Sequence, residues 1–111
     1  MGLVWFQTSG TMGEPRWIGL SRESLLLSAT VVNRHLGVRD DEVWGLVLPL
    51  HHVGGFGVVA RAYESGARLA VGPQAWDACA FTAWVERERV NHLSLVPTQV
   101  HDLIAARCVA P

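Results

Sequence analysis

The strongest constraint on the fold is residues 43–48 (VWGLVL), a continuous apolar run that ends at Pro49. A short run without polar alternation is typical of a strand buried on both faces, and it is far too short to cross a bilayer. Strands of this kind belong to parallel sheets whose two faces are covered by helices. The run therefore predicts an α/β protein with a mostly parallel sheet and flanking helices.

The segments around this run alternate between strand and helix patterns. Ser21 is the expected N-cap of the clearest helix, and Gly37 is its expected stop. The inward face of that helix is expected to hold Leu25, Ala29, Val32 and Leu36. We expect further strands at residues 3–7, 16–20, 67–71 and 92–96, and further helices over 51–65, after a cap at Asp77 and after a cap at Thr98. This alternation indicates helices packed on a parallel sheet.

Composition limits the size of the protein and the classes of partner. The chain has 111 residues, half of them hydrophobic, which is enough for one modest domain. Only 17% of residues are charged, below the usual quarter, so we expect either burial against a partner or a segment of a longer protein. All basic residues are scattered arginines, which argues against nucleic-acid binding. Two lone cysteines and no signal peptide or membrane span predict a cytoplasmic chain.

Residues 8–16 (TSGTMGEPR) form a glycine-rich stretch between two predicted strands. It is not a Walker loop, because lysine is absent and a strand, not a helix, is expected to follow. Its hydroxyls and glycines still suit phosphate, since backbone N–H groups can approach an anion closely and an arginine can bind it bidentately. A plain surface turn is the alternative. The candidate ligands are Thr8, Ser9, Gly10, Thr11, Gly13 and Arg16.

Residues 48–55 (LPLHHVGG) place His51 and His52 directly after the buried strand, where parallel sheets bind ligands. Adjacent side chains point apart, and no other histidine or cysteine shows ligand spacing, so we predict no metal site. Arg61 lies among small apolar residues of the next helix, where it either extends to solvent or pairs with an anion. The five tryptophans are expected to fill the core.

These motifs together resemble adenylate-forming enzymes, the acyl-CoA synthetase and luciferase superfamily. TSGTMGEPR resembles the phosphate-binding signature [ST]-[ST]-G-[ST]-[ST]-G-x-P-[KR], and LPLHHVGG resembles the histidine motif of the same enzymes. LPLHHVGGFGVVARAYESGARLAV and SLVPTQVHDLI are similar to the o-succinylbenzoate–CoA ligase branch, which serves menaquinone biosynthesis. The resemblance covers nearly all of this chain but a minor part of a full-length enzyme. It implies that residues 1–111 are one segment of the large N-terminal AMP-binding domain.

The resemblance also implies the chemistry. ATP and a carboxylic acid give an acyl-adenylate and pyrophosphate, and coenzyme A then displaces AMP. The phosphate-binding residues of segment 8–16 would hold the β- and γ-phosphates, with Mg²⁺ bound through those phosphates. His52 would line the acyl site and position the carboxylate, Arg61 would recognise the succinyl carboxylate, and Thr98 would line the acyl pocket. The segment departs from the signature at Met12, where a hydroxyl is usual, and at Arg16, where lysine is more usual.

Other functions remain open from the sequence. The acid could be another aryl or acyl acid, or the chain could be a non-catalytic binding or assembly module. The family's later adenine-binding segment, its ribose-binding aspartate and its C-terminal lysine are absent, so we expect the chain to be inactive alone. The expected partners are a small carboxylic acid, ATP, coenzyme A, and either the rest of the enzyme or a self-associated oligomer, without nucleic acid or membrane.

Overall fold

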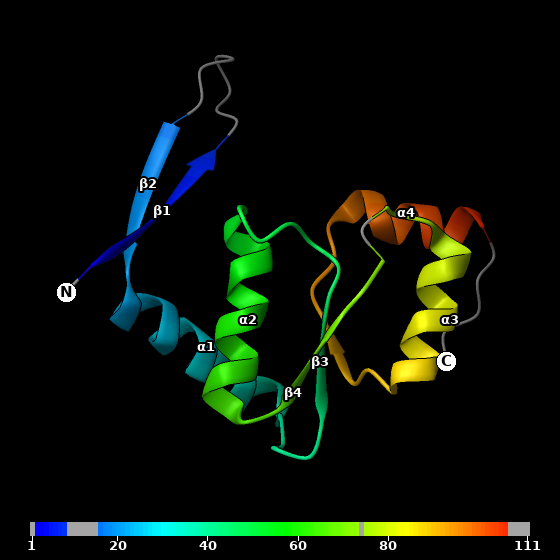
Figure 1. The fold of residues 1–111 in the computed structure, drawn as a ribbon, viewed down its shortest axis with the longest axis horizontal. Coiled ribbons are helices and arrows are strands. Elements are labelled where there is room, and N and C mark those ends of the chain that lie inside the picture. Colours follow the sequence, from blue (N-terminus) through cyan, green and yellow to red (C-terminus); the bar gives the residue numbers. More distant parts are fainter. Residues whose placement is uncertain (1, 9–15, 74, 107–111) are drawn as a thin grey trace.

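The computed structural model describes residues 2–8, 16–73 and 75–106 (Figure 1). It confirms the α/β architecture and contains two separate sheets within these residues. The elements are β1 (Leu3–Thr8), β2 (Arg16–Ser21), α1 (Arg22–Leu36), β3 (Val43–Leu46), α2 (Val53–Ser65), β4 (Arg68–Val71), α3 (Ala78–Glu88), β5 (His92–Leu93) and α4 (Pro97–Ala105).

The larger sheet is parallel, in the order β4-β3-β5, and β3 is its central strand. All four residues of β3 are buried, as the apolar run predicts. Val43 packs with Trp84 and other α3 residues in one cluster, whereas Trp44 packs with Val58 of α2 in another. Helices therefore cover both faces of the sheet, and each face has its own core.

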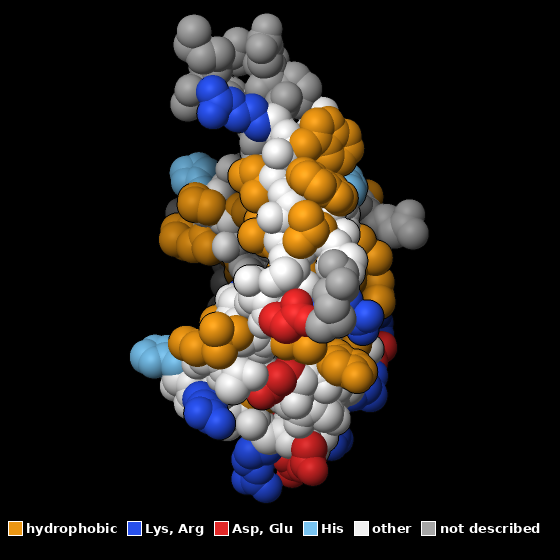
Figure 2. All heavy atoms as spheres, turned by 90° about the vertical axis from the view of Figure 1, so that its left-hand side faces the viewer, with side chains coloured by type: hydrophobic (Ala, Val, Ile, Leu, Met, Phe, Trp, Pro, Cys, Tyr) orange, Lys and Arg blue, Asp and Glu red, His pale blue; other side chains and the backbone are white. Residues whose placement is uncertain are grey.

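β1 and β2 form a separate antiparallel hairpin rather than joining the parallel sheet, among the strands that the structure describes. The buried ring of Phe6 meets Phe56 of α2 edge-on, with ring centroids 5.6 Å apart, and this contact anchors the hairpin. Apolar side chains gather along the hairpin surface in Figure 2, and the exposed residues include Trp5 and Trp17. The expectation that every tryptophan fills the core is wrong for these two, because a two-stranded ribbon has no second layer to cover them.

α1 begins and ends where its capping residues predict. The Ser21 side chain accepts a hydrogen bond from the backbone N–H of Ser24, and Gly37 adopts the left-handed conformation that ends many helices. Ala29 is buried on the predicted face, but Leu36 is exposed, so the inward stripe stops short of the last turn. Asn33 is buried in the same stripe, although it is polar.

Several element boundaries differ from the sequence prediction. β3 ends at Leu46 rather than at residue 48, and the ends of β1, β2 and β4 differ by one residue. α2 begins at Val53 rather than at residue 51, and β5 has two residues rather than five. α4 begins at Pro97 with Val96 as its N-cap, so Thr98 lies inside the first turn and does not cap the helix. Proline suits this first position because its missing N–H has no helical partner there and its φ angle is already helical.

Candidate functional site

The order of the strands defines where a ligand crevice is expected. The chain passes from β3 through α2 to β4 on one side, and then from β4 through α3 to β5 on the other side of β3. In open α/β sheets, ligands bind outside the carboxyl ends of the strands where the winding reverses. The reversal lies between β3 and β5, so the segments that leave these two strands flank the candidate site. These are the histidine motif and the segment that leads into α4.

Gln99 fixes these two segments to each other. Its buried side chain donates from Nε2 to the Val47 carbonyl oxygen over 3.2 Å, and its Oε1 accepts from the Val96 N–H over 3.1 Å. The first turn of α4 is thereby held against the chain that leaves β3. Thr98 lies in that turn and is exposed. The structure thus brings the α4 start and the histidine motif to the same edge of the sheet.

The two histidines follow β3 at this edge. His52 is the N-cap of α2, has extended backbone angles and makes no side-chain cap hydrogen bond. Its ring lies 4.4 Å from the His51 ring, and both side chains are exposed. His51 lines a pocket of about 360 Å³ with residues at the carboxyl ends of β3 and β4, among them Pro49 and Gly72, while His52 is not part of that lining. His51 therefore lines the pocket, whereas His52 caps α2.

Close backbone packing accounts for Gly55, one of the glycines that follow the histidines. A Cβ atom at this position would lie 2.1 Å from the carbonyl oxygen of Pro49, which is far inside any tolerated contact. The first turn of α2 is thus packed directly against the backbone that carries the histidine motif. Gly54 is different, because a Cβ there would meet only a Leu48 methyl group at 3.3 Å. At Gly55 the space that a side chain would occupy is therefore filled by the chain's own backbone.

Arg61 lies in α2 with its side chain half-buried. Its guanidinium carbon is 5.4 Å from the centre of the Trp44 ring, a distance at which a cation is attracted to the ring face. Burial lowers the pKa of the guanidinium, which nevertheless remains charged near neutral pH. No carboxylate forms an ion pair with it within the residues that the structure describes. Arg61 is therefore a half-buried cation held by an aromatic face and not by an anion.

A pocket of about 290 Å³ lies beside this guanidinium, between α1 and α2. Gly57 lines it, and a Cβ there would meet the guanidinium nitrogen at 3.7 Å, an ordinary van der Waals contact. The lining combines apolar side chains with two hydroxyls of α1: Leu20, Ser24, Leu25, Ser28, Ala29, Val53, Gly57 and Arg61. A cation and hydroxyl groups in a concave site suit a carboxylate attached to an apolar body.

Sequence reasoning missed Trp44 and Asn33 as neighbours of Arg61. The Trp44 indole N–H donates to the Asn33 side-chain oxygen over 3.1 Å, in a fully buried hydrogen bond. Asn33 follows Ala29 by four residues, so a polar side chain in the predicted inward stripe of α1 was the available signal. The partner of that side chain, on a different element, could not be identified from periodicity.

Residues 8–16, which the sequence predicts to bind phosphate, join β1 to β2. Thr8 and Arg16 face each other at the last pair of the hairpin register, and Arg16 is exposed. This end of the hairpin is directed the same way as the carboxyl ends of β3 and β4 in Figure 1. The remaining predicted phosphate ligands lie outside the described residues: Ser9, Gly10, Thr11 and Gly13.

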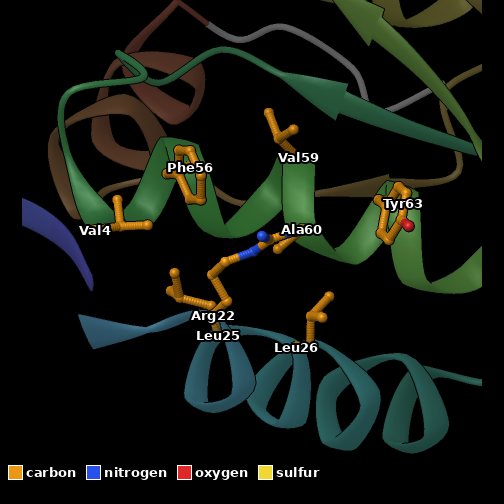
Figure 3. Close-up of a pocket in the computed structure, with 8 residues that line it drawn as sticks. All are labelled: Val4, Arg22, Leu25, Leu26, Phe56, Val59, Ala60 and Tyr63. Atoms are coloured by element: carbon orange, nitrogen blue, oxygen red, sulfur yellow. The ribbon is translucent and has the colours of Figure 1, made fainter. Parts of the chain in front are cut away.

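A second pocket between α1 and α2 has a different character. It measures about 300 Å³, and Figure 3 shows Val4 of β1 at one end and Tyr63 of α2 at the other. Arg22 reaches across it from the start of α1 toward Ala60. The rest of the lining is apolar, and none of the predicted site residues takes part. We therefore place the candidate site at the strand ends and at Arg61.

Metal-binding clusters and membrane-spanning helices are two further features to consider in the part of the chain that the structure describes. No group of three or more histidine, cysteine or acidic side chains there could hold a metal ion. Across the same residues, every helix is too short or too polar to span a bilayer.

Comparison with known proteins gives consistent relatives. A 2-succinylbenzoate–CoA ligase of Bacillus mycoides (strain KBAB4) is 31% identical over 97 residues, which cover 87% of this chain and 20% of that protein. The Bacillus subtilis o-succinylbenzoate CoA synthetase (MenE) with its acyl-adenylate OSB-AMP has a TM-score of 0.85 at 23% identity, covering 96% of this chain and 28% of that chain. The same enzyme with ATP and magnesium ion gives 0.84 at 23% identity, covering 96% and 22%.

A single-residue variant of E. coli MenE with bound OSB-AMS is 31% identical, with a TM-score of 0.77, covering 96% of this chain and 22% of that chain. The chain thus spans about a fifth of the length of the curated relative that it matches. The family described as AMP-binding enzyme matches residues 3–110, almost the whole sequence. The fold, the motifs and this match together show that the chain belongs to the AMP-binding family of adenylate-forming enzymes.

Proposed function

We propose that this chain is part of an adenylate-forming acid–CoA ligase whose acid is o-succinylbenzoate. The carboxylate oxygen of the acid attacks the α-phosphorus of ATP, and pyrophosphate leaves. The thiol of coenzyme A then attacks the acyl carbonyl carbon, and AMP leaves. Magnesium enters with ATP, bound through its phosphates. The proposal is supported by family membership and by relatives named 2-succinylbenzoate–CoA ligase at 31% identity.

The phosphate-binding role is assigned to residues 8–16. N–H and hydroxyl donors of this segment would stabilise the negative charge that develops on pyrophosphate as it leaves. The backbone pairing of Thr8 with Arg16 brings the two ends of the segment together and supports this assignment. Arg16 adds a positive charge at the same end of the hairpin. Met12 supplies no hydroxyl, so the segment has one donor fewer than the usual signature.

The acyl site is assigned to the edge of the sheet where β3 and β5 end. His52 would orient the carboxylate that is activated, and Thr98 would line the acyl pocket. The hydrogen bonds of Gln99 to Val47 and Val96 support placing both residues on one edge. The start of α2 at His52 adds a favourable end of a helix dipole for an anionic group.

Arg61 carries the assignment of the substrate. o-Succinylbenzoate has two carboxylates, so activation of one leaves the other as a fixed negative charge that needs a partner. The half-buried guanidinium of Arg61, which has no ion-pair partner among the described residues and lies beside a pocket of about 290 Å³, supplies that partner. A monocarboxylic acid would leave this half-buried cation without an anionic partner.

The test is substrate discrimination by an Arg61→Ala variant of the complete ligase that carries this segment. A charge-assisted hydrogen bond contributes about 1.5–3 kcal/mol, so kcat/KM for o-succinylbenzoate should fall roughly 10- to 150-fold. Turnover of an analogue whose second carboxylate is a neutral amide should change little. Arg87→Ala, an exposed arginine of α3, is the matched control. Equal losses with both acids would argue against the proposed role of Arg61.

A second measurement separates the ligase from a non-catalytic module. The complete ligase should release pyrophosphate only when ATP, magnesium and o-succinylbenzoate are all present. The 111-residue chain alone should release none, because it lacks the adenine-binding segment, the ribose-binding aspartate and the C-terminal lysine that the family resemblance implies for adenylation. Robust pyrophosphate release by the chain alone would contradict this proposal. Absence of magnesium-dependent ATP binding by the complete protein would favour the non-catalytic module.

A further inference from the structure

Arg61 and Glu64 are spaced so that they could neutralise each other. Residues three apart on a helix lie on the same face, and opposite charges at this spacing commonly pair. They form no ion pair in this structure. The Arg61 guanidinium lies over the Trp44 ring instead, and the Glu64 carboxylate accepts a hydrogen bond of 2.7 Å from the side-chain amide of Asn33.

Asn33 is the centre of this arrangement. Its amide nitrogen donates to the Glu64 carboxylate and, over 2.9 Å, to the Arg61 carbonyl oxygen. Its oxygen accepts from the Trp44 indole over 3.1 Å. A single buried side chain on α1 therefore holds the backbone at Arg61, the neighbouring acid on α2, and the aromatic ring on β3 that the guanidinium faces. No buried side-chain polar atom in the described part of the chain lacks a partner, which includes those of Asn33.

We infer that Asn33 is a positioning residue that keeps Arg61 available to a substrate carboxylate by holding Glu64 away from it and by fixing the Trp44 ring beneath it. This inference rests on the proposed function of Arg61. Asn33 does not itself line the pocket beside the guanidinium, so it acts through its neighbours.

The physical reason is competition between two carboxylates for one cation. If Glu64 were released, it could reach the guanidinium within one helical turn, and a substrate carboxylate would have to displace it before binding. The free energy needed to displace Glu64 would weaken binding of the second carboxylate. The chemical steps at the other carboxylate would be unaffected. The expected signature is therefore a higher KM with little change in kcat, limited to substrates that carry both carboxylates.

The experiment uses the complete ligase that carries this segment. Asn33→Ala should raise the KM for o-succinylbenzoate about tenfold, the effect of losing one net hydrogen bond of 1–1.5 kcal/mol. The KM for the amide analogue, which lacks the second carboxylate, should not rise. Adding Glu64→Gln to Asn33→Ala removes the competing charge and should lower the KM for o-succinylbenzoate again, leaving only the part of the rise that comes from the lost Trp44 hydrogen bond. Glu64→Gln alone should leave both KM values unchanged.

Two further variants keep the outcome interpretable. Asn33→Ser opens a similar space but retains a hydroxyl, so it guards against loss of folding in Asn33→Ala; it should show a smaller rise that Glu64→Gln again lowers. Equal rises for both acids, or no lowering of the KM by Glu64→Gln, would overturn the inference while leaving the role of Arg61 intact. If Arg61→Ala instead lowered kcat/KM equally for the two acids, the proposed role of Arg61 would itself be contradicted, whatever the Asn33 variants showed.

Discussion

The parallel sheet and the β1–β2 hairpin place the same residue type in opposite surroundings. Trp44 in β3 and Trp84 in α3 are 1% and 3% exposed, whereas Trp5 and Trp17 in the hairpin are 57% and 64% exposed. β3 has a helix layer on each face, while the hairpin is a single ribbon anchored through Phe6. The difference teaches that hydrophobicity alone does not assign a side chain to the core. The number of layers that the topology provides decides how much of it is buried.

The largest expected effect is in α3, the helix that covers one face of the parallel sheet. Trp84→Ala removes a buried indole that packs over Gly45, where a Cβ atom would come within 2.8 Å of the ring. Loss of a buried tryptophan costs about 3–5 kcal/mol of unfolding free energy. Urea unfolding of the variant and of the parent chain, followed by circular dichroism, measures the difference. A loss below 1 kcal/mol would mean that the sheet and its helices are not the main source of stability.

Gly55→Ala tests the contact between α2 and the histidine motif. The new Cβ would overlap the Pro49 carbonyl group, so the helix start must move, at a cost of about 1–3 kcal/mol or more. Gly54→Ala, one residue earlier, is the matched control, and should be neutral or stabilising by up to about 1 kcal/mol because alanine favours helix. Thermal unfolding of both variants checks the ranking, and equal effects would contradict it.

The residue directly before β3 is a carboxylate whose ionisation stabilises the fold. Glu42 Oε1 lies 3.0 Å from His92 Nε2, and this hydrogen bond, followed by that from the Arg39 backbone N–H, lowers the pKa of the Glu42 carboxyl group. A lowered pKa in the folded state stabilises the fold above the unfolded pKa of about 4.3, and this contribution disappears as the pH falls through the folded value.

Glu42→Gln should therefore destabilise the chain at neutral pH and lose its effect at low pH. Urea midpoints of parent and variant between pH 7 and pH 3 measure the convergence. Glu23→Gln, on the first turn of α1, serves as a control acid outside the sheet. A difference between parent and Glu42→Gln that stays constant down to pH 3 would exclude ionisation of Glu42 as its source.

The smallest expected effect is in the hairpin. Trp17→Ala removes a large side chain that is mostly exposed, and exposed substitutions usually change stability by less than about 0.5 kcal/mol. The same urea experiment as for Trp84→Ala gives the comparison directly. A cost of several kcal/mol would show that the hairpin surface is covered in solution, and would remove the contrast between the two regions.

The sequence predicted those parts of the fold that depend on local signals. The α1 boundaries follow from Ser21 and Gly37, and β3 follows from an unbroken apolar run. The start of α4 was misplaced because Pro97 was taken as the end of a strand, while it serves as the first residue of the helix. A proline is compatible with the end of a strand and with the first residue of a helix. The hydrogen bond from Gln99 to Val47, which holds the start of α4 in place, is a tertiary contact that the local sequence does not reveal.

The candidate site divides in the same way. Arg61 was noticed because a cation among apolar residues is visible in the sequence, while its predicted role came from the family resemblance. The contacts that link Arg61, Trp44 and Asn33 could not be predicted, because the three residues lie on three different elements. Asn33 is 11 residues from Trp44 and 28 residues from Arg61 in the sequence. Hydrogen bonds between distant elements are set by how the helices pack on the sheet, and periodicity carries no information about them.

The pairing of β1 with β2 has a consequence for how such chains diversify. The ladder between these strands is local, and the described registers of β3, β4 and β5 do not involve it. Substitutions in residues 8–16, such as methionine at position 12 in place of a hydroxyl, can therefore change the chemistry of this segment without altering the pairing of the parallel sheet. Evolution can adjust the chemistry of one region while the architecture of the other is inherited unchanged.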